Sequence, residues 1–305
     1  MIPSGSICAL ATPFRATDDT LDLDACGRLI DWQIEGGTRA LAIAGSTGEA
    51  AALDDAEYSA LLGFAARRID GRVPLLAGSG QSATRATIAR TRLARDAGAD
   101  IALVAAPAYV RPTQEGMYRH FSEVAEHGGL PLMLYNVPTR TACDLLPETV
   151  ARLAAHGNIH GIKEAVTDPV RMQALLALQQ EGFGIWSGDD PTALRALRAG
   201  ANGVVSVAAN VAPEKFAALC VAASADGDAE AAELDAQLRP LYELLAVEPN
   251  PIPVKWCLAR LGFGEAHLRL PLLPLSEAHH AAAEHVLSAL GLARPGAPAP
   301  AARLG

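Results

Sequence analysis

Lys163 is the residue whose type and surroundings point most directly to chemistry. It stands in a short apolar run, residues 159–165, directly after Gly161-Ile162 and before Glu164. This run has the composition of a buried strand, and burying a lysine there costs free energy unless its amine is paired with an acid or takes part in chemistry. Desolvation favours the uncharged amine, which is a nucleophile that forms Schiff bases with ketones and aldehydes. An ion pair with Glu164 or another acid is the alternative, and spacing alone leaves both open.

Tyr135 is the second candidate, in the preceding apolar run 130–138. If the two runs form adjoining strands with both side chains inward, its hydroxyl comes within reach of the Lys163 amine and could shuttle protons. The alternative is a core tyrosine whose hydroxyl merely reaches the rim.

The segment Gly45-Ser46-Thr47-Gly48-Glu49 combines two hydroxyls with two glycines. Glycines let a turn bend tightly, so its N–H groups and hydroxyls suit a small carboxylate or phosphate. A plain connection between strand and helix would show the same pattern.

A rival motif, Gly78-Ser79-Gly80-Gln81-Ser82-Ala83, is similar to a dinucleotide-binding fingerprint. That fingerprint needs an acid closing the next strand, but the next run ends Ala105-Ala106-Pro107, so the nucleotide interpretation is disfavoured. Metal motifs are also missing from the sequence: there is no H-E-x-x-H, and His279, His280 and His285 belong to the polar side of a late helix. We therefore expect no metal.

The candidate residues must be positioned by eight short apolar runs that alternate with helix-period segments. Runs without apolar/polar alternation are typical of strands buried on both faces. The expected strands are 7–14, 40–45, 74–80, 101–107, 130–138, 159–165, 184–189 and 203–210, and the expected helices are 21–35, 54–69, 82–97, 113–126, 147–155, 168–180 and 191–199. The count favours an α/β fold, a closed (β/α)8 TIM barrel, over an open doubly wound sheet. In such a barrel the active site lies at the carboxyl ends of the strands.

The strand signal stops near residue 226, and helical segments follow at 229–247, 253–261 and 276–290. We predict a barrel domain over residues 1–225 and a C-terminal helical appendage over 226–292. Residues 293–305 hold three prolines and repeated alanine without a periodic apolar face, which predicts a disordered tail.

Composition excludes several classes of protein. Among 305 residues, half are apolar and 19% are charged, which excludes a disordered chain. The net charge of −9 without a basic run argues against nucleic acid as a partner. Five scattered cysteines, the absence of a basic-plus-apolar leader and the absence of a long apolar stretch lead us to expect a cytoplasmic protein without a membrane segment.

Four motifs together resemble the dihydrodipicolinate synthase family of pyruvate-dependent class I aldolases. They are Gly45-Ser46-Thr47-Gly48-Glu49, Tyr135-Asn136-Val137-Pro138 with Arg140, Gly161-Ile162-Lys163-Glu164-Ala165 and Ser187-Gly188-Asp189-Asp190. The similarity extends over residues 7–290 and includes the segments 247–255 and 268–271 of the helical appendage.

The resemblance implies a lyase-class synthase of lysine and diaminopimelate biosynthesis, which condenses pyruvate with L-aspartate 4-semialdehyde to give 4-hydroxy-tetrahydrodipicolinate. Lys163 would form the Schiff base with pyruvate, without an organic cofactor. A proton relay would be formed by Tyr135, Ser46 and Tyr109, of which Tyr109 would come from a second copy of the chain across a dimer interface.

The resemblance also implies substrate-binding roles. Thr47 would hold the pyruvate carboxylate, the main-chain carbonyl of Val205 and Gly188 would line the pyruvate pocket, and Arg140 would bind the carboxylate of the semialdehyde. Arg140 separates the chain from N-acetylneuraminate lyases, which lack it, whereas Ser46 is lyase-like because synthases usually carry threonine there. A related aldolase with another aldehyde acceptor, or a non-catalytic keto-acid-binding barrel, are the alternatives.

Regulation and assembly are expected to depart from the family pattern. Asp55, Tyr58, Ser82 and Ala86 stand where lysine-inhibited synthases carry two histidines, an asparagine and a glutamate, so we expect weak or absent feedback by lysine. The family's tetramer, a dimer of dimers, is expected. Ala108 replaces a second tyrosine beside Tyr109 and removes an aromatic contact from the dimer interface.

Overall fold

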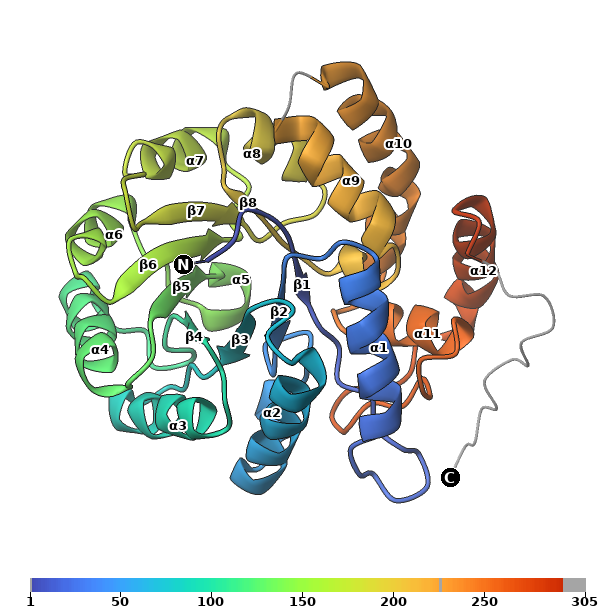
Figure 1. Cartoon of the computed structure of the whole chain (residues 1–305), viewed down its shortest axis with the longest axis horizontal. Helices are drawn as coiled ribbons and strands as arrows, with labels where there is room; N and C mark the ends of the chain where they lie inside the picture. The colour runs from blue at the N-terminus through green and yellow to red at the C-terminus, as the bar shows by residue number, and fades with distance from the viewer. Residues whose placement is uncertain (1, 225–226, 293–305) are drawn as a thin grey trace.

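Eight parallel strands close into a barrel in the order of the chain, so the (β/α)8 prediction is confirmed and the open sheet is wrong (Figure 1). The computed structural model describes residues 2–224 and 227–292. The strands are β1 Gly5–Ala9, β2 Ala40–Ile43, β3 Leu75–Gly78, β4 Ile101–Ala105, β5 Leu132–Asn136, β6 Ile159–Glu164, β7 Gly184–Ser187 and β8 Gly203–Ser206.

Helices form the outer ring. They are α1 Leu23–Glu35, α2 Asp55–Ile69, α3 Thr84–Asp96, α4 Gln114–His127, α6 Pro147–Ala154, α7 Pro169–Leu176, α8 Ala193–Arg198 and α9 Pro213–Ser224. The short helix α5 Pro138–Thr141 lies inside this ring, directly after β5 (Figure 1). Capping side chains determine where two of these helices begin. Asp54 and Glu57 form a capping box at the start of α2, and the Thr113 hydroxyl accepts from Gly116 N–H at the start of α4.

The strands end earlier than the apolar runs that predicted them. The run 7–14 is a strand only to Ala9, and the run 203–210 turns after Ser206 into the 3₁₀ helix η2 Ala208–Asn210. Another 3₁₀ helix, η1 Ala50–Ala52, and the short α5 were not predicted, and α9 was not among the predicted segments. The residues left over at the carboxyl ends of the strands form the loops of the barrel mouth.

Register brings the candidate residues of β5 and β6 together. Tyr135 pairs with Lys163 and Asn136 with Glu164 across these parallel strands. Successive side chains of a strand point to opposite faces, so Tyr135 and Lys163 share the inner face, and Asn136 and Glu164 share the outer one.

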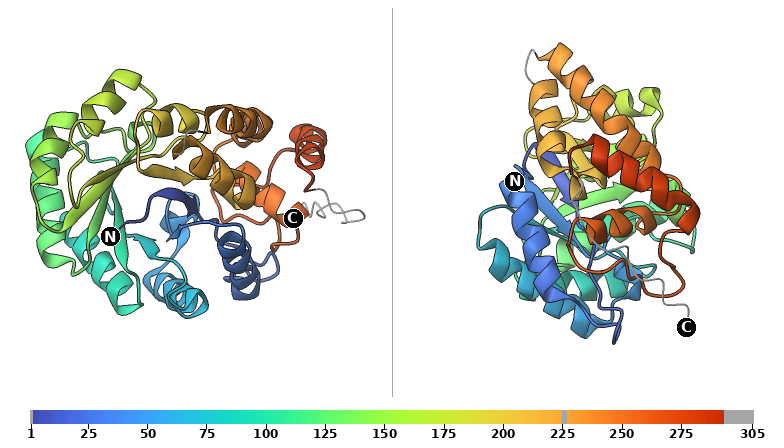
Figure 2. Two further views of the ribbon diagram at one scale, coloured as in Figure 1. Left: turned by 45° about the horizontal axis from the view of Figure 1, so that its top comes forward. Right: turned by 90° about the vertical axis from the view of Figure 1, so that its right-hand side faces the viewer.

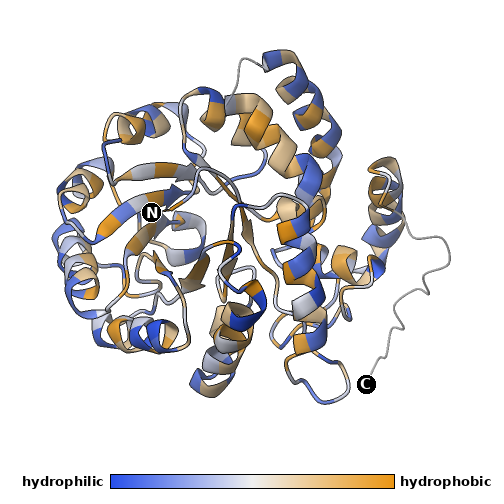
Figure 3. Ribbon diagram, in the orientation of Figure 1, coloured by the Kyte–Doolittle hydropathy of each residue, from blue (hydrophilic) through white to orange (hydrophobic). Residues whose placement is uncertain are grey.

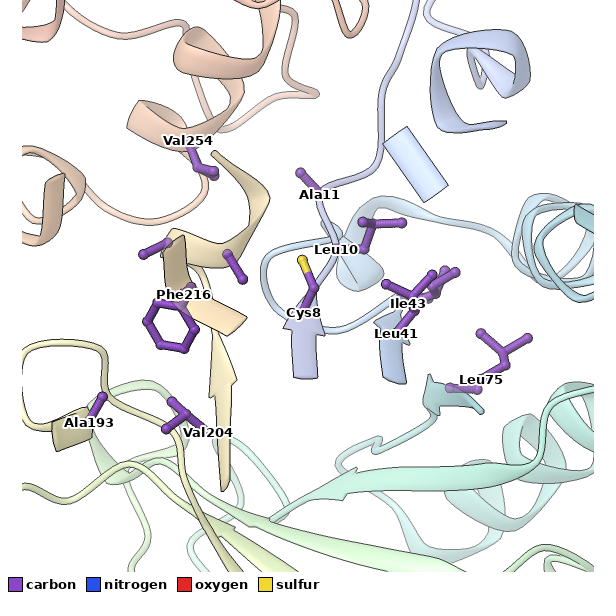
Figure 4. Close-up of a cluster of buried hydrophobic side chains, with 14 of the residues drawn as sticks. Cys8, Leu10, Ala11, Leu41, Ile43, Leu75, Ala193, Val204, Phe216 and Val254 are labelled. Carbon is purple, nitrogen blue, oxygen red and sulfur yellow. The ribbon is translucent and has the colours of Figure 1, made fainter. Parts of the chain in front are cut away.

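The core has two layers. The barrel interior is filled by side chains of alternate strand residues, including Ile7, Leu103, Met133 and Trp186. The other strand residues meet the helices: Figure 4 shows Cys8, Leu41 and Val204 on the strands together with Phe216 of α9. The hydropathy colouring shows the matching pattern on the outer helices, where hydrophobic and hydrophilic residues alternate around each helix (Figure 3). The ring of helices is therefore held by apolar burial on one side of each helix.

The helical appendage lies on one side of the barrel, beyond α9 and α1 (Figures 1 and 2). It consists of α10 Asp228–Leu245, α11 Ile252–Arg260, the 3₁₀ helix η3 Glu277–His279 and α12 His280–Ala289. Leu238, Tyr242, Trp256 and Leu287 are buried in the same apolar cluster as Phe216, so the appendage packs directly on the barrel. The predicted disordered tail, residues 293–305, lies outside the described residues. Among the helices of the described residues, none is long and apolar enough to cross a membrane.

Candidate active site

A cavity of about 210 Å³ opens at the carboxyl ends of the strands. Its lining residues are Ala9, Ala42, Gly45, Ser46, Thr47, Leu103, Tyr135, Val137, Thr139, Arg140, Lys163, Ala165, Gly188, Asp189, Val207 and Asn250. Six of the eight site residues expected from the sequence are therefore brought together here: Ser46, Thr47, Tyr135, Arg140, Lys163 and Gly188.

Lys163 is buried beside Tyr135 at the inner end of this cavity. The residue is 5% exposed, and its Nζ lies 4.3 Å from the centroid of the Tyr135 ring. Tyr135 is itself buried and reaches the cavity. The amine and the phenol ring are thus neighbours on the inner face of the barrel, while the reach of the Tyr135 hydroxyl to the amine stays a prediction.

Glu164 does not form an ion pair with Lys163. Its carboxylate faces the outer helices, where it accepts from the Asn136 amide at 3.0 Å, from Val166 N–H at 2.7 Å and from Arg171 Nε at 2.8 Å. Burial raises the pKa of Glu164, whereas these donors act in the opposite direction. Within the described part of the chain Lys163 has no ion pair at all, so the ion-pair interpretation of Lys163 is wrong.

Gly188 leaves the space that the Lys163 side chain occupies. A Cβ atom at Gly188 would lie 2.8 Å from Lys163 Cε, closer than real Cβ atoms come, and 3.1 Å from its Cγ, which is also a tight contact. The glycine after β7 therefore allows the lysine stem to extend along the inner face of the barrel toward the cavity.

The turn after β2 carries Ser46 and Thr47 into the cavity. Thr12, beyond the end of β1, donates its hydroxyl to the Gly48 carbonyl at 2.8 Å. A side chain on Gly48 would meet Thr12 Oγ1 at 3.0 Å and the Leu10 carbonyl at 3.1 Å, so this close approach favours glycine. The turn predicted from the two glycines is thus present, and both hydroxyl residues line the cavity.

Glu49 attaches the same turn to the helical appendage. Its carboxylate forms an ion pair with Lys255 of α11 and also accepts from the Arg269 N–H at 3.1 Å. Both members of the ion pair are buried, and burial lowers the pKa of Lys255 to about 8 even though Glu49 opposes the change. The appendage is therefore part of the support of the site.

Arg140 lies at the outer rim of the cavity on the short helix α5. It is exposed, and its Nη2 donates to the main-chain carbonyl of Asn250 at 3.0 Å. An exposed guanidinium at a cavity rim is suited to a carboxylate because its fork of donors matches two oxygens.

Tyr109 and Val205 do not line the cavity in the single chain. Tyr109 is 92% exposed, with φ of 74°, in a tight turn closed by Val110 N–H to the Ala108 carbonyl at 2.9 Å. Such a γ-turn with positive φ is uncommon and strained for a residue other than glycine. Val205 is buried in the barrel interior among residues that include Ile7 and Trp186, whereas Val207 reaches the cavity.

The sequence analysis missed several lining residues, among them Asp189, Thr139 and Asn250. Asp189 belongs to the quoted Ser187-Gly188-Asp189-Asp190 motif, so a signal existed for it; its Oδ2 accepts from the Thr192 hydroxyl at 2.7 Å. Asn250 lies in the quoted segment 247–255, but its chain position gives no hint that it meets the barrel mouth.

The glycines of the motif that is similar to a dinucleotide-binding fingerprint have a structural explanation. A Cβ atom at Gly78 would lie 2.2 Å from the Ala44 carbonyl, and one at Gly80 would lie 2.8 Å from Ala105 N. These glycines are therefore explained by close packing of neighbouring strand ends. Among the described residues there is no cluster of three or more histidine, cysteine or acidic side chains that could hold a metal ion.

The fold and the site together define a class of protein. A closed (β/α)8 barrel with a buried lysine beside a tyrosine, and with hydroxyls at the mouth, is the arrangement of a lysine-dependent aldolase.

The comparisons with known proteins identify the family. The model of the dihydrodipicolinate synthetase family matches residues 2–290. A 4-hydroxy-tetrahydrodipicolinate synthase of Stenotrophomonas maltophilia (strain K279a) is 56% identical over 283 residues, which cover 93% of this chain and 95% of that protein. The chain therefore belongs to the dihydrodipicolinate synthetase family.

Solved structures agree with this assignment. Dihydrodipicolinate synthase from Acinetobacter baumannii, complexed with pyruvate, is 40% identical with a TM-score of 0.92, covering 95% of this chain and 99% of that one. The enzyme from Cyanidioschyzon merolae with lysine bound is 32% identical with a TM-score of 0.90, covering 95% and 98%.

Proposed function

We propose that this chain condenses pyruvate with L-aspartate 4-semialdehyde to give 4-hydroxy-tetrahydrodipicolinate. The observation that carries the proposal is the buried Lys163 amine beside Tyr135, in a cavity that also presents the hydroxyl residues Ser46 and Thr47. The name of the relative from Stenotrophomonas maltophilia, at 56% identity, supports the same reaction.

Lys163 acts as the nucleophile. Its uncharged Nζ attacks the ketone carbon of pyruvate, and the resulting carbinolamine loses water to form the Schiff base. Tyr135 transfers the protons that these two steps require, with Ser46 as the next hydroxyl of the relay. Thr47 donates its hydroxyl proton to the pyruvate carboxylate, and the Val205 carbonyl and Gly188 complete the pocket around the ketoacid.

The second substrate enters past Arg140. The pyruvate methyl group loses a proton to the relay, which converts the Schiff base into an enamine. The terminal carbon of the enamine attacks the aldehyde carbon, and the aldehyde oxygen takes up a proton from the relay and becomes a hydroxyl group. Arg140 binds the carboxylate of the semialdehyde and orients this aldehyde toward the enamine. The amino group of the semialdehyde then displaces Lys163 from the former ketone carbon, which closes the ring and regenerates the free amine.

The working form is proposed to be a homo-oligomer, the family's dimer of dimers, in which a dimer is required because the relay needs Tyr109. That side chain is exposed in the single chain, and it does not line the cavity of its own barrel. A second copy would receive it at its cavity. Ala108 offers little contact beside it, which weakens the dimer interface but leaves the tyrosine in place.

We also propose that lysine is a weak inhibitor or none. Arg90 contacts two of the four positions that differ from lysine-inhibited relatives, Asp55 and Tyr58. Its Nη1 pairs with Asp55 at 2.8 Å, and its Cζ lies 4.0 Å from the centroid of the buried Tyr58 ring. A buried cation at this place disfavours a second cation such as the lysine side chain.

We propose a cytoplasmic location because the cysteines are not paired in disulfides. All five cysteines of the sequence are free, and four of them are buried. Unpaired buried thiols are typical of proteins of reducing compartments.

Turnover with different aldehydes tests the proposed reaction. With pyruvate present, we expect kcat/KM for L-aspartate 4-semialdehyde to exceed that for sugar-type aldehydes such as N-acetylmannosamine by at least about a hundredfold, because only the former places a carboxylate at Arg140. Comparable values for both aldehydes would instead assign the chain to a lyase-like aldolase, and ligand-induced stabilisation by pyruvate without any turnover would indicate a non-catalytic binding barrel.

A further inference from the structure

We propose that Asn250 is a positioning residue that holds Thr47 and Arg140, the two carboxylate-binding residues of the proposed reaction, in a fixed arrangement. This inference rests on the proposed function and deepens it. Neither the motifs at the strand ends nor the cavity alone assigns a role to this asparagine, which belongs to the connection between α10 and α11.

Asn250 contacts Thr47 and Arg140 through two different groups. Its side-chain Nδ2 donates to Thr47 Oγ1 at 3.0 Å, and its main-chain carbonyl accepts from Arg140 Nη2 at 3.0 Å. All three residues line the cavity. One residue of the appendage therefore bridges the turn after β2 and the helix after β5, which lie on separate sides of the barrel mouth.

The direction of the bond to Thr47 determines what the threonine can do. A hydroxyl has one proton to donate and lone pairs that accept. Because the Asn250 amide occupies an accepting side of Thr47 Oγ1, the Thr47 proton stays available for the pyruvate carboxylate. Asn250 thus orients Thr47 as a donor.

Packing alone does not account for an asparagine at this position. Its Oδ1 is buried and has no hydrogen-bond partner among the described residues, which is a cost that an apolar side chain of similar size would avoid. The polar bond from Nδ2 to Thr47 is the interaction that only the amide provides.

The connection that carries Asn250 is itself held at the barrel mouth. Five residues further along the chain, Lys255 forms its buried ion pair with Glu49, two residues beyond Thr47. The turn Thr47-Gly48-Glu49 is therefore attached to the appendage at both of its ends, so Asn250 acts on Thr47 from a fixed support.

Four variants test the proposal: Asn250→Ala, Asn250→Asp, Thr47→Val and the double variant of Asn250→Ala with Thr47→Val. The first readout is the pyruvate concentration that gives half-maximal borohydride trapping on Lys163, which requires no aldehyde. The second is the pair of KM values for pyruvate and the semialdehyde.

We expect Asn250→Ala to raise the half-maximal pyruvate concentration about tenfold, the size of one lost hydrogen bond to a charged group. Asn250→Asp should raise it further, because an aspartate would capture the Thr47 proton and repel the pyruvate carboxylate. The double variant should be no worse than Thr47→Val alone, because both single changes remove the same interaction.

Asn158→Ala is the matched control. Asn158 also bridges two segments through its amide, donating to the Ala125 and Leu130 carbonyls at 2.8 and 2.9 Å, but it precedes β6 at the opposite end of the barrel. It should lower stability without changing either KM.

Additive effects of Asn250→Ala and Thr47→Val, or an Asn250→Asp variant that binds pyruvate like the wild type, would overturn the inference. So would Asn250 variants that, like Asn158→Ala, only lose thermal stability. A wild-type chain that traps no pyruvate on Lys163 would be a failure of the proposed function instead, and wild-type trapping separates the two cases.

Discussion

Gly188 shows how a residue without a side chain sets the geometry of the Lys163 amine. A methyl group there would lie 2.8 Å from Lys163 Cε, and Ala165 Cβ stands 3.2 Å away on another side. The lysine, which is the flexible partner in this contact, would have to leave its present path.

We therefore predict that Gly188→Ala lowers kcat at least about tenfold, because a misplacement of a reacting group by about 1 Å is costly. Steady-state kinetics together with thermal unfolding would show this. Gly157→Ala is the matched control, because a Cβ atom there meets nothing within 4 Å. Equal kinetics of the two alanine variants would contradict the packing argument.

At the residue scale the sequence predicted much of the site. Lys163, Tyr135, Ser46 and Thr47 line the cavity as the motifs implied, because each stands at the carboxyl end of a strand, where a barrel gathers its loops. The ion-pair alternative for Lys163 could not be excluded from spacing. It is the alternation of strand faces, with Glu164 outward beside Arg171, that excludes it.

At the scale of the elements, the interface between α3 and α4 contains a titratable side chain that is not part of the active site. His120 of α4 is 4% exposed, and its Nδ1 lies 2.9 Å from the Thr84 hydroxyl at the start of α3. Burial lowers the pKa of His120 from 6.5 to about 4.

We predict from this lowered pKa a loss of stability in acid. Between pH 6.5 and about 4 the unfolded chain binds a proton at His120 and the folded chain does not, so the free energy of unfolding falls as the pH falls. The contribution lost between about pH 7.5 and pH 5 is about 2 kcal/mol. Urea unfolding at the two pH values would measure it.

His120→Gln should show a smaller acid loss than the wild type, because glutamine does not titrate. His127→Gln, at a half-exposed position of the same helix, should leave the acid loss unchanged. The same pH dependence in all three proteins would show that other groups cause it.

At this scale the sequence predicted the order and the number of the strands but not their ends. An apolar run continues through residues such as Leu10 and Ala11 because these remain buried in the mouth loops, so hydrophobicity does not mark the end of a strand. The short elements α5, η1 and η2 are one turn or less, too short for a periodic signal.

For the whole molecule, the proposed dimer contact involves Tyr109, and the proposed loss of lysine feedback involves the α2–α3 surface. Arg90 is held there between Asp55 and Tyr58. We predict that L-lysine at about 1 mM lowers the initial rate by less than about a tenth, because the buried Arg90 guanidinium beside Asp55 and Tyr58 would repel a second cation at this proposed place. Strong inhibition in a steady-state assay would contradict this.

Arg90→Ala tests the cause. If Arg90 blocks the binding of lysine, lysine should inhibit the Arg90→Ala variant at least as strongly as it inhibits the wild type. Any gain of inhibition should appear in this variant before it appears in others. Arg92→Ala, a change of an exposed arginine on the same helix that donates to the His127 carbonyl, is the control.

Contacts across the whole chain were beyond sequence-based prediction. The bond between Asn250 and Thr47 joins residues 203 positions apart, and no periodicity or motif spacing specifies such a pair. The division of the chain at residue 226 stays a prediction, while the burial of Trp256 and Phe216 in one cluster shows how closely the appendage and the barrel pack.

Borohydride reduction in the presence of pyruvate, followed by peptide mass mapping, shows whether Lys163 is the amine that forms the Schiff base. We expect one pyruvate adduct per chain, on Lys163, and no adduct in the Lys163→Ala variant. An adduct on Lys215 or Lys255, or none on a chain that still binds pyruvate, would contradict this expectation.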